Sequence, residues 1–380
     1  EAHAFHSAAT HGFVRVAAAT PVVHIADPVA NAAEHAALIR QAGAEGVDLL
    51  VFPELSLSGY AIDDLLMQDA LLVEVERQIG HLAEVAGEAG VVAVVGAPLR
   101  NGDALFNCAA VLANGQVLGV VPKSYLPNYR EYYEKRWFSP AAGRAEDVLV
   151  LNGESVDFAP GLIFEADDRP GFVFAVEICE DFWAPLPPST RAALAGARIL
   201  CNLSASNIVI GKADERAVLC ASQSVRTLSA YVFAASGWGE STTDLAWDGQ
   251  ATIHELGAKL AEGPRFSLES HLTVADVDVE RIGLDRLRNG TFADCARLEG
   301  EAATVVPFSA PGHDGVDTLL RPLDRFPFVP DDPARLDRDC YEAFNIQVQG
   351  LMRRMTATGA ERLVIGVSGG LDSTQALLVA

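Results

Sequence analysis

The stretch Phe172-Val173-Phe174-Ala175-Val176-Glu177-Ile178-Cys179-Glu180-Asp181 is an apolar run that ends at a cysteine followed by two acidic residues. Its length and its content of valine and phenylalanine predict a buried strand. Two other strand-like runs end at reactive side chains, with residues 49–52 leading to Glu54 and residues 117–121 leading to Lys123. Strand ends are rigid positions, so the pattern places three reactive groups on a sheet framework.

Short apolar segments alternate with longer segments of helical period, which predicts an α/β fold. Asn114-Gly115 tolerates positive φ and predicts a tight hairpin. Further strands are expected at 199–203 and 231–235, which would complete one domain up to about residue 295. An amphipathic helix is expected where apolar residues recur at spacings of three and four, at Leu72, Val75, Ile79, Leu82 and Ala86.

The 380 residues carry 28 Lys and Arg against 51 Asp and Glu, a formal net charge of −23. This charge argues against nucleic acid or an anionic membrane surface as a partner. No apolar run reaches the roughly 18 residues that a membrane span needs. The six cysteines form no Cys-x-x-Cys pair, so we expect no metal site and a reducing, cytoplasmic location.

A second domain is expected after a proline-rich segment. We expect a first domain over 8–295, a linker over 296–335 and the start of a second domain over 336–380. That second domain should open with a helix around Phe344 and a strand at 363–367. The chain lacks an initiator Met and stops inside an apolar run, so it is expected to be part of a longer protein. The prolines that favour a linker are Pro307, Pro311, Pro322, Pro327, Pro330 and Pro333.

Cys179, Glu54 and Lys123 together suit attack on an amide carbonyl. A free thiol is only a few per cent thiolate at neutral pH, so a nucleophilic cysteine needs a base, which Glu54 can supply. An ammonium such as that of Lys123 can stabilise the negative charge on the carbonyl oxygen. Taken singly, these residues also suit a core cysteine and a structural ion pair.

Three ordered motifs resolve this ambiguity by resemblance. Phe52-Pro53-Glu54-Leu55, Pro122-Lys123-Ser124-Tyr125-Leu126-Pro127 and Glu177-Ile178-Cys179-Glu180-Asp181 resemble the signatures of the carbon–nitrogen hydrolase (nitrilase) superfamily. The resemblance implies an α-β-β-α nitrilase-type sandwich and a catalytic Glu54-Lys123-Cys179 triad.

The residues in and around these motifs are similar to those of the glutaminase domains in the glutamine-dependent NAD synthetase family. Tyr129-Arg130-Glu131-Tyr132-Tyr133-Glu134 and Asn202-Leu203-Ser204-Ala205-Ser206 carry this resemblance, together with Phe182-Trp183 after the cysteine motif. It implies that Glu134 supports Lys123. It also implies a glutamine pocket formed by Tyr60, Tyr129, Glu180, Trp183, Ser206 and Lys212.

A glycine-rich string near the end of the chain resembles the pyrophosphate-binding loop of N-type ATP pyrophosphatases. Glycines let backbone amides approach phosphate at a helix start, and no Gly-Lys-Ser of a Walker loop is present. The resemblance implies the start of a Rossmann-like ATP-pyrophosphatase domain. The ATP-binding residues would be Gly366, Val367, Ser368, Gly369, Gly370, Leu371, Asp372 and Ser373.

Both resemblances together imply that glutamine hydrolysis supplies ammonia for the ATP- and Mg²⁺-dependent amidation of deamido-NAD to NAD. The glutaminase step itself would need no cofactor. Family resemblance also implies a homo-oligomer. One alternative is a stand-alone amidase or nitrilase of the same superfamily, and another is a non-enzymatic scaffold that keeps the fold.

Overall fold

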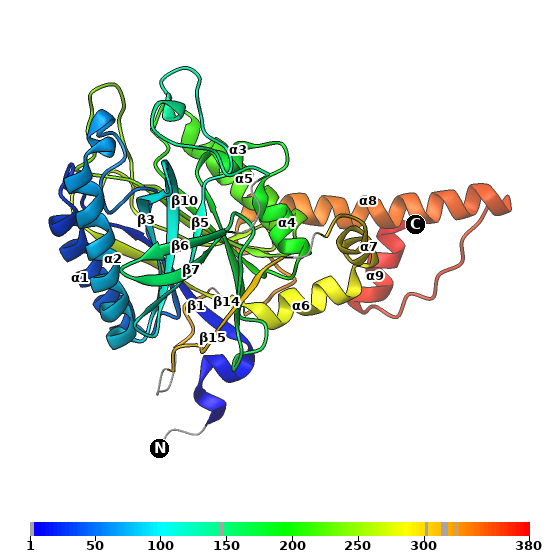
Figure 1. The fold of residues 1–380 in the computed structure, drawn as a ribbon. Coiled ribbons are helices and arrows are strands. Elements are labelled where there is room, and N and C mark those ends of the chain that lie inside the picture. Colours follow the sequence, from blue (N-terminus) through cyan, green and yellow to red (C-terminus); the bar gives the residue numbers. More distant parts are fainter. Residues whose placement is uncertain (1–3, 144–146, 301–302, 313–317, 322, 324) are drawn as a thin grey trace. The chain divides into compact units, whose positions relative to one another are not determined.

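A computed structural model describes residues 4–143, 147–300, 303–312, 318–321, 323 and 325–380. The chain divides into two compact units, Glu1–Arg321 and Pro322–Ala380 (Figure 1). Pro322, one of the prolines of the expected linker, lies outside the described residues. None of the helices in the described ranges has the length and hydropathy that crossing a bilayer requires.

The described strands of the first unit form two mixed sheets. In spatial order, the first sheet holds β14 (His271–Asp278), β1 (Phe13–Thr20), β2 (Leu49–Val51), β3 (Val92–Asn101), β4 (Ala104–Ala113), β5 (Gln116–Pro122), β7 (Glu154–Phe158) and β6 (Asp147–Leu151). The second holds β13 (Ala258–Glu262), β12 (Ala251–Glu255), β11 (Ala230–Ala235), β10 (Ile199–Ser204), β9 (Val173–Ile178), β8 (Ile163–Ala166) and β15 (Val305–Phe308).

Helices cover the outer faces of the two sheets, which pack against each other (Figure 1). On the first sheet lie α1 (Pro28–Ala44) and α2 (Asp69–Ala89), whose apolar faces share one core with its strands. On the second lie α4 (Pro188–Leu194) and α5 (Lys212–Arg226). A central core between the sheets includes Val51, Val176 and Leu203. The expected α-β-β-α sandwich is therefore confirmed.

Local sequence signals explain several element boundaries. The Asp27 side chain caps α1 by accepting a hydrogen bond from the Ala30 amide, and Pro28 occupies its first position. Asn114 and Gly115 turn between β4 and β5 with φ of 52° and 80°, which confirms the hairpin. The predicted apolar face of α2 is buried along its whole length.

The expected linker contains a strand. β15 pairs in parallel with β8 at one edge of the second sheet, so Pro307 needs no hydrogen bond on its outer side. The compact unit therefore continues past the predicted domain end near residue 295, and the domain boundaries stay a prediction. Before β15, the chain forms α6 (Val279–Arg288) and α7 (Gly290–Glu299).

The second unit contains α8 (Pro333–Thr358) and α9 (Leu371–Val379). The helix expected around Phe344 is thus confirmed, but the strand expected at 363–367 is wrong, because the segment is irregular. A strand needs a hydrogen-bonded neighbour, and the described residues of this unit supply no second strand. A Rossmann-like sheet is accordingly not present among them.

Candidate active site

The three predicted catalytic residues follow the carboxyl ends of strands from both sheets. Glu54 comes after β2, Lys123 directly after β5, and Cys179 directly after β9. Cys179 has φ of 44° and ψ of −94°, a conformation that costs a non-glycine residue energy. Such a strained turn, which also starts the short helix α3 (Glu180–Trp183), is a common feature of functional sites.

A buried ion network surrounds Lys123. Its Nζ donates to Oε1 of Glu54 at 2.6 Å and to Glu134 at 2.8 and 3.0 Å. Asn107 donates to Oε1 of Glu54, and the Ala205 amide donates to Oε2, at 2.7 and 2.8 Å. Burial alone would lower the pKa of Lys123, but the Glu134 and Glu54 carboxylates raise it well above its ordinary value. The ammonium therefore stays charged.

The Cys179 thiol lies within electrostatic range of this network. Burial and the Glu54 carboxylate raise the pKa of the thiol well above its ordinary value, while Lys123 opposes the rise. A hydrogen bond from the Ala205 amide also stabilises the thiolate form. Because the resting thiol keeps its proton, attack on a substrate needs a base that removes the proton during the step.

Glu134 links Tyr60 to Lys123. The Tyr60 hydroxyl donates to Oε1 of Glu134 at 2.7 Å. Burial raises the pKa of Glu134 to about 7, although Lys123 acts in the opposite direction. A cavity of about 40 Å³, lined in part by Tyr60, Tyr132 and Glu134, adjoins this contact. Tyr60 therefore touches the ion network from the side of Glu134.

The other predicted pocket residues gather around the same thiol. The Tyr129 hydroxyl donates to the Glu180 carboxylate at 3.0 and 3.1 Å. The Lys212 ammonium lies 5.8 Å from the centre of the Trp183 ring. The Cys179 thiolate would influence the pKa values of both Tyr129 and Lys212. The Lys212 cation and the Tyr129 hydroxyl, which binds the Glu180 carboxylate, thus lie within electrostatic range of the Cys179 thiol.

Ser206 is buried, and its hydroxyl has no hydrogen-bond partner within the described ranges. Its carbonyl oxygen accepts a hydrogen bond from Arg216 at 2.7 Å, which fixes the backbone beside Ala205. The structure therefore places the backbone of Ser206 beside Ala205, whose amide contacts Glu54, and leaves the Ser206 hydroxyl buried and unpaired among the described residues.

Several residues of the site were not predicted from the sequence. Asn107 holds Glu54, and its signal was a polar side chain inside the apolar run that forms β4. Asn207 accepts hydrogen bonds from Lys212, at 2.7 Å, and from Tyr132. Within the described ranges, the side chains of Asp181 and Glu240 accept hydrogen bonds from backbone amides, most of them in distant segments, so no spacing in the sequence reveals these partners.

The predicted ATP loop forms an exposed turn before α9. The Ser368 amide donates to Oγ of Ser373 at 3.2 Å, and Oγ of Ser373 donates to the Gly370 carbonyl at 3.1 Å. Gly369 has φ of 87°, which favours glycine, and open space surrounds both Gly366 and Gly369. The other predicted residues of the loop, Val367, Leu371 and Asp372, are exposed.

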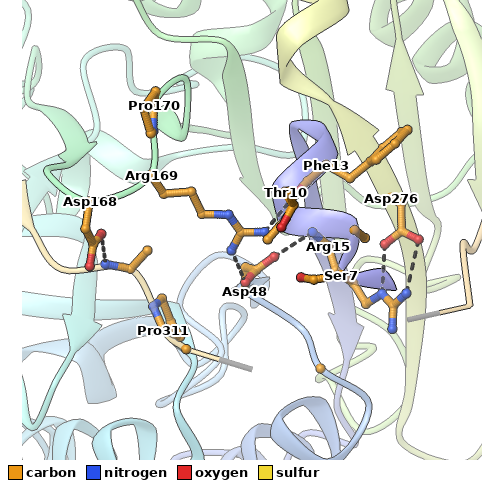
Figure 2. Close-up of a pocket in the computed structure, with 15 residues that line it drawn as sticks. Ser7, Thr10, Phe13, Arg15, Asp48, Asp168, Arg169, Pro170, Asp276 and Pro311 are labelled. Carbon is orange, nitrogen blue, oxygen red and sulfur yellow. Dashed lines mark hydrogen bonds and ion pairs between the residues drawn. The ribbon is translucent and has the colours of Figure 1, made fainter. Parts of the chain in front are cut away.

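A larger cavity of about 390 Å³ lies at the opposite ends of β1 and β2 (Figure 2). Its arginines face carboxylates, since Arg15 pairs with Asp276 at 2.7 Å and Arg169 pairs with Asp48. These ion pairs balance charge within the cavity wall, and we assign no ligand to it. No group of three or more metal-ligating side chains occurs within the described parts of the chain.

A model of the carbon–nitrogen hydrolase family matches residues 14–287, so the chain belongs to this family. The chain is 52% identical over 379 residues to the glutamine-dependent NAD(+) synthetase of Mycobacterium tuberculosis, which covers 99% of this chain and 56% of that protein. The chain thus spans little more than half the length of this relative.

Solved structures show the same fold. The glutamine-dependent NAD+ synthetase of Acinetobacter baumannii in complex with adenosine diphosphate matches with a TM-score of 0.59 at 27% identity, covering 71% of this chain and 46% of that chain. An amidase from Nesterenkonia sp. AN1 matches with a TM-score of 0.54 at 21% identity, covering 72% of this chain and 93% of that chain.

Proposed function

We propose that this chain is the glutamine-hydrolysing part of a glutamine-dependent NAD synthetase, which uses the released ammonia to convert deamido-NAD to NAD. The observation that carries the proposal is the buried Lys123 ammonium, which contacts Glu54 at 2.6 Å and lies in electrostatic range of Cys179. The 52% identity to a relative of that name supports the choice of glutamine over other amides.

In the proposed reaction, Glu54 accepts the thiol proton as Sγ of Cys179 bonds to the amide carbon of glutamine. The carbonyl oxygen takes the electron pair and is stabilised by Lys123. The C–N bond then breaks, and ammonia leaves with the proton from Glu54. Water hydrolyses the γ-glutamyl thioester to glutamate and restores the thiol.

The glutamine pocket would use the predicted residues according to their chemistry. Glu180, held by Tyr129, suits the substrate ammonium, and Lys212 suits its carboxylate. Trp183 offers an apolar face to the methylene groups, and the unpaired Ser206 hydroxyl a further hydrogen bond. Tyr60 and Glu134 would hold Lys123 in place rather than contact the reacting bond.

The loop over residues 366–373 fits the pyrophosphate of ATP. Exposed glycines leave the backbone accessible, and the helix that follows directs its positive end at the loop. When bound with Mg²⁺, ATP supplies the activation of the nicotinate carboxylate. We also expect a homo-oligomer that acts in the cytoplasm.

The proposal predicts a division of labour in the full-length protein. Cys179→Ala should abolish NAD formation from glutamine but keep formation from added ammonium, because ammonia bypasses the thiol. Asp372→Ala should prevent formation from either nitrogen source. Cys295→Ala, at an exposed cysteine of α7, is the control and should change neither reaction. A folded Cys179→Ala variant that also lost the ammonium-driven reaction would refute this assignment.

A further inference from the structure

Asp181 joins the two segments that carry Lys123 and Cys179. Its Oδ2 accepts hydrogen bonds from the amides of Ile178 at 3.1 Å and Ser124 at 3.3 Å. Its Oδ1 accepts from the Tyr125 amide at 2.8 Å. Ile178 directly precedes the nucleophile, and the other two donors directly follow Lys123. One carboxylate thus bridges strand ends from opposite sheets of the sandwich.

The contacts of Asp181 act where the backbone is under strain. Asp181 is 2% exposed, and its hydrogen bonds from the Ile178 and Ser124 amides are buried, so these two amides have little access to water as an alternative acceptor. The Cys179 turn, at φ of 44°, is held on one side by the bond from its own amide to the Leu203 carbonyl, at 2.8 Å. On the other side, toward Lys123, the hydrogen bonds that Asp181 accepts hold the turn in place.

We propose that Asp181 is a positioning residue that fixes the distance between the Cys179 thiol and the Lys123 ammonium. This inference rests on the proposed hydrolysis at Cys179. Asp181 does not act on the substrate, because its oxygens are engaged by backbone amides. Its effect comes through geometry, since a displacement of about 1 Å between reacting groups can cost roughly 10²-fold in rate.

The test compares Asp181→Asn and Asp181→Ala with the wild type in glutamine hydrolysis. Asparagine has one acceptor oxygen where aspartate has two. It can therefore keep either the hydrogen bond from Tyr125 or those from Ser124 and Ile178, whereas alanine loses all three. We expect kcat to fall about tenfold or more in the asparagine variant and further in the alanine variant. KM should change little, because the pocket residues remain.

Asp48→Asn is the matched control. Asp48 is equally buried and accepts a hydrogen bond from the Arg15 amide at 2.8 Å, but it lies at the opposite end of the strands, in the wall of the cavity in Figure 2. The Asp48→Asn substitution should lower the stability of the protein without changing kcat per folded molecule.

A second measurement separates positioning from stability. The rate at which iodoacetamide alkylates Cys179 is followed against pH and assigned to the residue by mass spectrometry. The Lys123 ammonium lowers the pKa of the Cys179 thiol. If the Asp181 variants move Lys123 away from the thiol, their alkylation rates should rise at higher pH than the wild-type rate does. The Asp48 variant should keep the wild-type profile.

The outcomes are distinct. A folded Asp181→Asn variant with wild-type kcat and an unchanged alkylation profile would overturn the inference. So would a loss of kcat that equals the loss in the Asp48 variant. If the wild type itself fails to hydrolyse glutamine, the proposed function is wrong, while the alkylation profiles still decide whether Asp181 positions Lys123 against the thiol. If Asp181→Ala does not fold, the asparagine variant decides.

Discussion

The Lys123 ammonium lies 2.6 Å from Oε1 of Glu54, and both side chains are completely buried. An ammonium and a carboxylate lose much hydration on burial, so a pair of this kind is weak evidence for stability alone. Glu134 adds a second carboxylate to the same ammonium. We therefore interpret the cluster as catalytic. A catalytic cluster and a structural ion pair differ in what substitution of Lys123 should do to activity.

Lys123→Met separates the two interpretations. Removing the ammonium leaves Glu54 and Glu134 buried without their partner, which should cost about 3–5 kcal/mol of stability in chemical unfolding. Adding Glu134→Gln should restore part of this stability, because one buried charge is removed. Glutamine hydrolysis should stay roughly 10²-fold or more below wild type in both variants. Recovery of activity along with stability would show that the pair is structural.

Gly96 is predicted to be necessary for the placement of Glu54. A Cβ at this position of β3 would lie 2.3 Å from the Pro53 carbonyl oxygen and 2.5 Å from the Leu55 amide nitrogen. Gly96→Ala should therefore push the Glu54 segment away, lowering stability by about 1–3 kcal/mol and reducing the hydrolysis rate per folded molecule. Gly161→Ala, where a Cβ meets open space, is the control. Equal rates in the two variants would contradict this prediction.

Glu240 makes stability depend on pH. Its buried carboxylate accepts hydrogen bonds from the Tyr60 and Ala61 amides, and burial raises its pKa from 4.5 to about 7. Because the folded pKa is the higher one, the folded state binds more protons between these values. The contribution of Glu240 to stability therefore falls as pH rises from about 4.5 to 7.

Glu240→Gln removes this titration. Relative to wild type, the free energy of unfolding of the variant should rise by up to about 3 kcal/mol between pH 4.5 and 7.5, as denaturant titrations at several pH values can show. Glu88→Gln, at an exposed position of α2, should follow the wild-type curve. Parallel curves for wild type and Glu240→Gln would contradict the prediction.

Much of the site was predictable because its residues follow recognisable strands. The runs before Glu54, Lys123 and Cys179 carry their own strand signal, and each reactive side chain comes directly after such a run or two residues later. The hairpin at Asn114-Gly115 was predictable for a similar reason, since the conformation of the turn depends on two neighbouring residues that tolerate positive φ.

The errors and omissions have a different physical origin. The run at 363–367 has a strand-like composition, but a strand also needs a partner that the described residues of its unit do not supply. Pro307 is compatible with a strand only because β15 lies at a sheet edge. Glu240 binds the amide of Tyr60 across 180 residues of sequence, a proximity that only the folded chain creates.

Cys179 is the proposed nucleophile for glutamine, and a diazo-ketone analogue of glutamine provides a direct test of this role. Mass spectrometry of the treated protein should show one covalent adduct on Cys179, and an excess of glutamine should protect against it. The buried thiols of Cys108, Cys201 and Cys220 should remain unmodified. An adduct on one of those three cysteines, or no adduct on a protein that hydrolyses glutamine, would show that Cys179 is not the nucleophile.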